Sequence, residues 1–137
     1  CGANKVLEID PETLTVKHIG ESLGGLVWGK AAYSCIAAGV NGKLYAPPDE
    51  VGKVLEIDPD TSTVQEIGDE FIFGYACIIA GGNGKLYAAP NHERRKVLEI
   101  NPETSTVKEI GDSLESGSRY SCIVAGGNGK LYSPPYF

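Results

Sequence analysis

The feature that most constrains this chain is a block of sequence that recurs three times. Lys-Val-Leu-Glu-Ile begins at Lys5, Lys53 and Lys96. Gly-Lys-Leu-Tyr begins at Gly42, Gly84 and Gly129. Successive copies lie 42 to 48 residues apart, whereas ankyrin and tetratricopeptide repeats take roughly 33–34 residues. The spacing therefore favours repeats built from four strands over helical repeats.

Each copy consists of four short strand-like runs separated by turn residues. In the unit 33–68 the Asn41-Gly42 pair supplies the positive φ angles of a tight hairpin turn. Pro47-Pro48 ends the second run, because proline cannot donate to a sheet. Asp58-Pro59 forms the turn between the last two runs. We therefore expect strands over Tyr33–Ala38, Lys43–Ala46, Lys53–Ile57 and Thr63–Ile67, joined as an antiparallel meander.

A four-stranded unit of this kind has two apolar faces and buries both only by packing against neighbours around an axis. The order of motifs in this chain is a strand, Asn-Gly-Lys-Leu-Tyr, Val-Leu-Glu-Ile-Asp-Pro and a strand ending in Ile-Gly. This order resembles the six-bladed propellers of the NHL and gluconolactonase-like type and the tandem propeller repeats of protists. The expected fold is all-β, a β-propeller segment over residues 1–137 with three four-stranded blades, which span 33–68, 75–111, and 120–137 plus 1–19.

The third blade is split between the two ends of the sequence. Three blades cannot close a ring, since propellers use about 4–8. We therefore expect a head-to-tail homodimer of six blades, in which the final strands of each chain complete the first blade of the other. A trimer of nine blades lies outside the usual range. The alternative is a segment of a longer polypeptide, which the first residue, Cys1 in place of Met, favours.

Composition and charge narrow the classes of partner. With 42% apolar and 22% charged residues the chain has the composition of a globular protein. A net charge of -6 argues against nucleic acid as a partner. No apolar run approaches the ~20 residues that span a bilayer, so no membrane partner is expected. The sequence does not indicate a cellular location.

Three of the four cysteines occupy one repeated position, at Cys35, Cys77 and Cys122. Equivalent positions in neighbouring blades lie too far apart for a disulfide, which needs roughly 4.4–6.8 Å between Cα atoms. We expect these three to be small buried side chains. Cys1 stands outside the repeat and is expected to be an exposed thiol or an intermolecular bridge.

Positions that differ between the copies are free to serve a ligand, and they fall in two loops per blade. In a meander both loops emerge on the same side of the ring, here called the loop face. Aromatic and arginine residues, which are enriched at binding hot spots, lie in these loops. The candidate binding residues are Trp28, Lys30, Phe71, Phe73, His92, Arg94, Arg95, Arg119, Tyr136 and Phe137. Alternatively, the tryptophan and the phenylalanines cap the core.

The shared positions are assigned to the scaffold. Glu8, Glu56 and Glu99 recur in every copy and are interpreted as outward strand charges, so no catalytic residue is assigned. The resemblance to gluconolactonase-like enzymes implies a divalent metal held at the axis by acidic and amide side chains. The inner strands here carry Cys, Ser, Ala and Ile instead, so no cofactor or metal is expected.

The leading hypothesis is a non-enzymatic propeller that binds a protein, glycan or small ligand on the loop face, or that serves as a structural module. A metal-dependent hydrolase or lyase with an axial site is the second. An engineered or consensus-like repeat without a natural ligand is the third, because the copies match so closely.

Overall fold

The structure is a computed structural model that describes residues 4–23, 33–72, 74–92 and 95–136. These residues form strands and turns and contain no helix. The strands are β1 (Val6–Asp10), β2 (Thr15–Ile19), β3 (Ala37–Ala38), β4 (Leu44–Ala46), β5 (Gly52–Asp58), β6 (Thr63–Phe71), β7 (Tyr75–Ala80), β8 (Leu86–Pro90), β9 (Val97–Asn101), β10 (Thr106–Ile110), β11 (Val124–Ala125) and β12 (Leu131–Tyr132).

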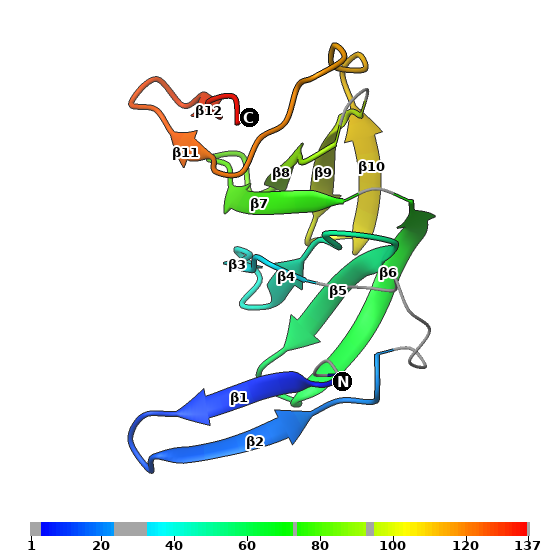
Figure 1. Ribbon diagram of the computed structural model, residues 1–137. Helices are drawn as coiled ribbons and strands as arrows, with labels where there is room; N and C mark the ends of the chain where they lie inside the picture. Colours follow the sequence, from blue (N-terminus) through cyan, green and yellow to red (C-terminus); the bar gives the residue numbers. More distant parts are fainter. Residues whose placement is uncertain (1–3, 24–32, 73, 93–94, 137) are drawn as a thin grey trace.

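Two four-stranded antiparallel meanders form the centre of the molecule. One has the order β3-β4-β5-β6 and the other β10-β9-β8-β7. They lie side by side, with β6 against β10 and β3 against β7 (Figure 1). The expected all-β fold with four-stranded antiparallel units is confirmed by this arrangement. Strand β6 is longer than the sequence predicted, because Phe71 pairs with Gly52 across a bulge.

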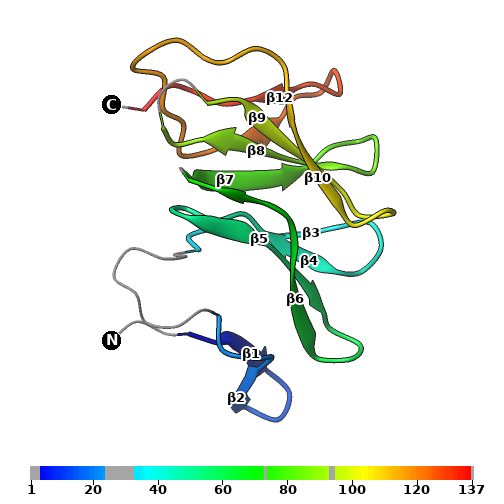
Figure 2. The same cartoon turned by 90° about the vertical axis from the view of Figure 1, so that its right-hand side faces the viewer.

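Two half-sheets flank the central pair. The β1-β2 hairpin corresponds to the last two strands of a unit, and the β11-β12 hairpin to the first two. Along the molecule the order is β1-β2, the β3–β6 sheet, the β7–β10 sheet and then β11-β12 (Figure 2). Since the two half-sheets lie at opposite ends (Figure 1), neither completes the other within the chain.

The turns follow the chemistry that the sequence indicated. Gly42 adopts a φ of 80°, and Asn41 Oδ1 accepts from the Lys43 backbone amide at 3.1 Å. Asp58 Oδ1 accepts from the Asp60 amide at 3.0 Å. The last turn of each copy contains one left-handed residue that is not glycine. These residues are Leu14, Ser62 and Ser105, with φ angles of 57°, 53° and 52°.

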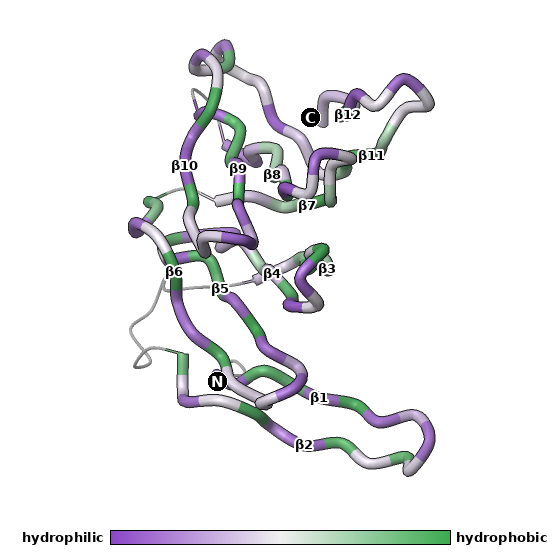
Figure 3. Tube along the Cα trace, turned by 180° about the vertical axis from the view of Figure 1, so that it is seen from behind, coloured by the Kyte–Doolittle hydropathy of each residue, from purple (hydrophilic) through white to green (hydrophobic). Residues whose placement is uncertain are grey.

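The hydrophobic core lies between the two complete sheets. Tyr45, Val54 and Phe71 of the first sheet and Leu98 and Ile100 of the second belong to one buried hydrophobic cluster. Hydrophobic and hydrophilic residues alternate along the strands (Figure 3), as expected when a strand presents opposite faces. Because each of the two complete sheets lies between two neighbours, neither face of its strands is left to solvent.

Two expectations for the shared positions are wrong. Glu56 and Glu99 do not point outward: both are buried, with relative exposures of 2% and 9%. The three repeated cysteines are free, as expected, but of these only Cys77 is buried, while Cys35 is half-buried and Cys122 is exposed; Cys1 lies outside the described residues. Cys122 lies in the incomplete unit, beyond which the described chain supplies no further sheet. No helix in the described ranges is long and apolar enough to cross a membrane.

Candidate functional site

A hydrogen-bond network centred on the buried carboxylate of Glu56 lies inside the structure. Tyr45 Oη donates to Glu56 Oε2 at 2.9 Å, and Gln65 Nε2 donates to Oε1 at 2.6 Å. Ser105 Oγ, from the next sheet, donates to Oε2 at 2.7 Å. Lys43 Nζ completes the shell 3.4 Å from Oε1. Each oxygen of this carboxylate therefore has two protein donors.

The network sets the charge state of its members. Burial acts to raise the pKa of Glu56, but hydrogen bonds from Ser105, Gln65 and Tyr45 and the charge of Lys43 outweigh it, so the pKa is lowered. Burial raises the pKa of Tyr45 to about 12. The carboxylate is therefore ionised and the phenol protonated at neutral pH, as a stable donor–acceptor pair requires.

The same network recurs in the next copy. Tyr87 Oη donates to Glu99 Oε2 at 3.1 Å, and Lys85 Nζ lies 3.4 Å from Glu99 Oε1. Lys108 Nζ lies 3.5 Å away, at the position that Gln65 occupies in the preceding copy. Burial again opposes these partners, and again the pKa of Glu99 is lowered. Because the network repeats with the blade, it belongs to the scaffold.

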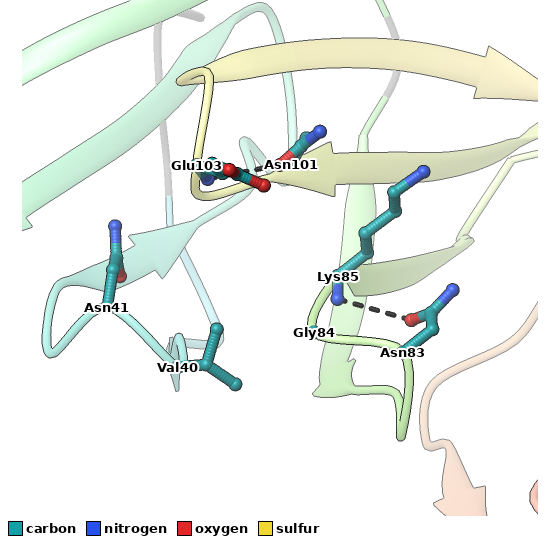
Figure 4. A pocket seen from close by; sticks show the side chains of 7 residues that line it. All are labelled: Val40, Asn41, Asn83, Gly84, Lys85, Asn101 and Glu103. Atoms are coloured by element: carbon teal, nitrogen blue, oxygen red, sulfur yellow. Dashed lines mark hydrogen bonds between the residues drawn. The ribbon is translucent and has the colours of Figure 1, made fainter.

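A hollow of about 310 Å³ lies between the two complete sheets, on the side of their short turns (Figure 4). Its lining residues are Val40, Asn41, Asn83, Gly84, Lys85, Asn101 and Glu103. The asparagine groups are already engaged. For example, Asn41 Nδ2 donates to Tyr45 Oη at 2.9 Å and to Pro102 O at 3.1 Å. These amides therefore build turns and join the sheets, so the hollow is part of the scaffold.

The loop face has its own repeated backbone frame. The Tyr75 amide donates to Pro48 O at 2.8 Å, and the Tyr120 amide donates to Pro90 O at 3.1 Å. These bonds tie the second strand of each sheet to the first strand of the next. The residues that follow these prolines in the three copies are Asp49, Asn91 and Tyr136. Equivalent backbone positions therefore carry a carboxylate, an amide and a phenol.

Further backbone hydrogen bonds join Asn91 and Tyr136 to residues that differ between the copies. The backbone N–H of Asn91 donates to Gly74 O at 3.1 Å, and the backbone N–H of Tyr136 donates to Arg119 O at 2.8 Å. Gly74 is required where it stands, because a Cβ there would lie 2.0 Å from the carbonyl carbon of Asp49. Asn91 Nδ2 lies 3.5 Å from Asp49 Oδ1, which links the neighbouring copies side chain to side chain.

The structure distributes the predicted binding residues unequally. Arg119 and Tyr136 are exposed, the latter by 54%, and adjoin each other on the loop face. His92 is half-buried next to Asn91. Phe71 is buried in the core, where its ring meets Tyr75 edge-on at 5.8 Å, which favours the capping interpretation. Trp28, Lys30, Phe73, Arg94 and Phe137 lie outside the described residues.

Arg95 is committed to an internal pair. Its Nη2 lies 3.1 Å from Glu109 Oε1, and its Nε is buried. Both side chains act on Tyr75: burial raises the pKa of Tyr75 to about 12, Glu109 acts in the same direction and Arg95 against it. This pair joins β10 to the segment just before β9, so Arg95 contributes to packing more than to the exposed surface.

Asp49 and Asn91 were absent from the candidate binding residues, which favoured aromatic and basic side chains. The signal that identifies them is positional, since each follows the last proline of a second strand. Within the described part of the chain, no three His, Cys, Asp or Glu side chains gather into a group that would hold a metal ion.

Comparison with known proteins establishes the fold. No protein-family model and no curated protein sequence matches the chain. Among solved structures, streptogramin B lyase superimposes with a TM-score of 0.72 at 17% identity, over 97% of this chain and 42% of that one. The extracellular domain of the putative one-component system BT4673 from B. thetaiotaomicron gives a TM-score of 0.69 at 14% identity, over 96% and 18%.

Hydrazine synthase from Kuenenia stuttgartiensis gives a TM-score of 0.67 at 14% identity, over 95% of this chain and 35% of that one. The chain thus spans less than half the length of these three proteins. Their differing names show that similar folds serve different functions. The fold is all-β and propeller-like, as the sequence predicted.

Proposed function

We propose that this chain is a β-propeller module that binds a ligand through its loop face, without catalysing a reaction. One contrast supports this proposal above all. The buried carboxylates, Glu56 and Glu99, are engaged by a repeated network. The groups that differ between copies, half-buried at Asp49 and Asn91 and exposed at Arg119 and Tyr136, occupy a repeated backbone frame. A scaffold that holds its backbone constant while varying the side chains at one face is suited to recognition.

The side chains on that frame indicate the class of ligand. Asp49 and Asn91 offer a carboxylate and an amide within 3.5 Å of each other. Arg119 and Tyr136 add a guanidinium and a phenol held together by a backbone hydrogen bond. Carboxylate, amide and guanidinium groups bind hydroxyl and carboxylate groups, and an exposed tyrosine ring offers a flat surface for stacking. This set favours a glycan, acidic glycans included.

Thermal shift measurements on a panel of neutral and acidic oligosaccharides test this function. A ligand that binds the folded chain raises its melting temperature by mass action. Tyr136→Ala and Arg119→Ala should each weaken binding by about tenfold or more, as hot-spot residues do. The matched control is Lys17→Ala, which removes an exposed cation from β2 and should leave affinity unchanged. If no member of the panel raises the melting temperature, a glycan is excluded as the ligand class.

A metal-dependent hydrolase at the axial mouth is the second candidate, and one observation favours it. Asp49 and Asn91 bring an acidic and an amide side chain together at the loop face. Two such side chains fall short of the 6–8 oxygen ligands that Ca²⁺ takes. The donors described here therefore do not fit a metal centre by themselves. Elemental analysis separates the candidates, since a stoichiometric ion would favour the enzyme.

A further inference from the structure

The seams between consecutive sheets share one steric feature. A Cβ built on Gly20 would lie 2.8 Å from Val64 Cβ, and one built on Gly68 would lie 2.8 Å from Val107 Cβ. At both seams a valine from the following sheet thus packs directly onto a glycine of the preceding one, Gly20 just after β2 and Gly68 within β6. These two glycines have φ angles of 74° and 73°, so their backbones match as well.

The third copy of this glycine and the third copy of this valine have no packing partner within the described chain. Gly111 ends β10 with a φ of 72°, the same conformation, but a Cβ built on it meets nothing within 4 Å. Val16 of β2 is equivalent to Val64 and Val107, yet its side chain is 60% exposed. The two open ends of the molecule therefore carry the two halves of a third seam.

The strand edges are complementary in the same way. In the complete unit, Leu44 pairs with Ile57 and Tyr45 with Glu56 between β4 and β5. The corresponding residues of the half-sheets are Leu131 and Tyr132 on β12, and Ile9 and Glu8 on β1. Tyr132 is 50% exposed and Ile9 is 63% exposed, whereas Tyr45 and Ile57 are buried. Each half-sheet leaves exposed what a complete unit buries.

We propose that a second copy of this chain covers both open ends. Its β1-β2 hairpin pairs with β12 of the first copy and places its own Val16 on Gly111, while the first copy does the same in return. Completing both split units gives six four-stranded sheets, within the usual range of about 4–8 for a closed propeller. Such an assembly is a ring with two-fold symmetry, in which the two seams between the copies are identical.

The proposed seam between the two copies differs from the seams within one chain at one position. Ser105 Oγ donates to Glu56 at 2.7 Å, and Ser62 Oγ donates to Glu8 at 3.3 Å, each from the sheet that follows. The residue equivalent to these serines on β1-β2 is Leu14, which is 84% exposed. In the ring it faces Glu99 of the other copy, so the seam between copies lacks a bond that the internal seams have.

Sedimentation velocity of the 137-residue chain tests the assembly. We expect a species of twice the chain mass that dissociates on dilution. Val16→Asp should give a folded monomer at the same concentration, since Val16 is already exposed in one chain. Val40→Asp, at a 74% exposed valine of a turn, is the matched control and should remain dimeric. A folded wild-type monomer at high concentration, or a Val16→Asp variant that stays dimeric, would overturn the proposal.

Leu14→Ser tests the seam from the opposite direction. Its hydroxyl restores the donor to Glu99, and a hydrogen bond to a charged group corresponds to about tenfold tighter association per seam. Leu14→Ala is the control, because it removes the same side chain without adding a donor. An equal effect of both substitutions on the dissociation constant would show that Glu99 does not face this position in the dimer.

Discussion

Glu56 and Glu99 occupy the same position in consecutive copies, yet their surroundings differ. Glu56 lies in a seam closed on both sides and accepts from neutral Gln65 and from Ser105. Glu99 lies at the open edge, where no serine donor reaches it within the described residues and Lys108 replaces the glutamine. The comparison shows that a buried carboxylate can be stabilised by neutral donors when the seam is complete, whereas the open edge relies on a second, exposed cation.

Replacing each carboxylate in turn by glutamine tests most directly whether the two networks differ in strength. Glu56→Gln should cost about 3 kcal/mol of unfolding free energy, because a buried charged acceptor is removed from its four donors. Glu99→Gln should cost about 1 kcal/mol, since its lysine partners are partly exposed and such pairs are worth little. Urea unfolding measures both values. Equal costs would show that the seam does not determine the strength of the network.

These measurements should be made at matched, low protein concentration. Association through the open ends would add to the stability of both variants and obscure their difference. Val16→Asp supplies a common background in which both variants are expected to be monomeric. The comparison then reports the network alone.

The sequence predicted the sheets because their determinants are local. Asn41-Gly42 and Asp58-Pro59 lie beside the strands that they join, and the structure forms turns at both. The burial of Glu56 depends on Ser105, which is 49 residues away on another sheet, so alternation along one strand could not reveal it. Alternation along a strand assigns Glu56 to one of two faces of its sheet, but it does not show that a neighbouring sheet covers that face.

The candidate site was predictable in part for the same reason. Arg119 and Tyr136 were identified because they differ between copies, and the structure joins them by a backbone hydrogen bond. Phe71 lies in a stretch that reads as a loop, but its pairing with Gly52 extends β6 and draws the ring into the core. Bulged pairings depend on geometry across the sheet, which spacing along the chain does not encode.

A smaller effect, and a finer test of the comparison, is the pH dependence of stability. The folded-state pKa of Glu56 is lowered, so its contribution is fully present above the ordinary glutamate pKa of about 4.3 and is lost as the pH falls through the folded value. The stability difference between wild type and Glu56→Gln should therefore be constant near neutrality and shrink below about pH 4.5. Backbone hydrogen bonds from Glu12 and Thr13 also lower the pKa of Asp10. The titration of Asp10 is the same in both proteins, so it cancels from the stability difference.

The same titration with Glu99→Gln provides the matched comparison. The pKa of Glu99 is also lowered, so the sign is the same and its stability difference should shrink over the same acidic range. The amplitude should be smaller, because part of its stabilisation comes from lysines that water already screens. Urea unfolding between pH 3 and pH 7 checks both curves. Parallel curves for wild type and Glu56→Gln would mean that the carboxylate titrates normally and that the buried network does not hold it ionised.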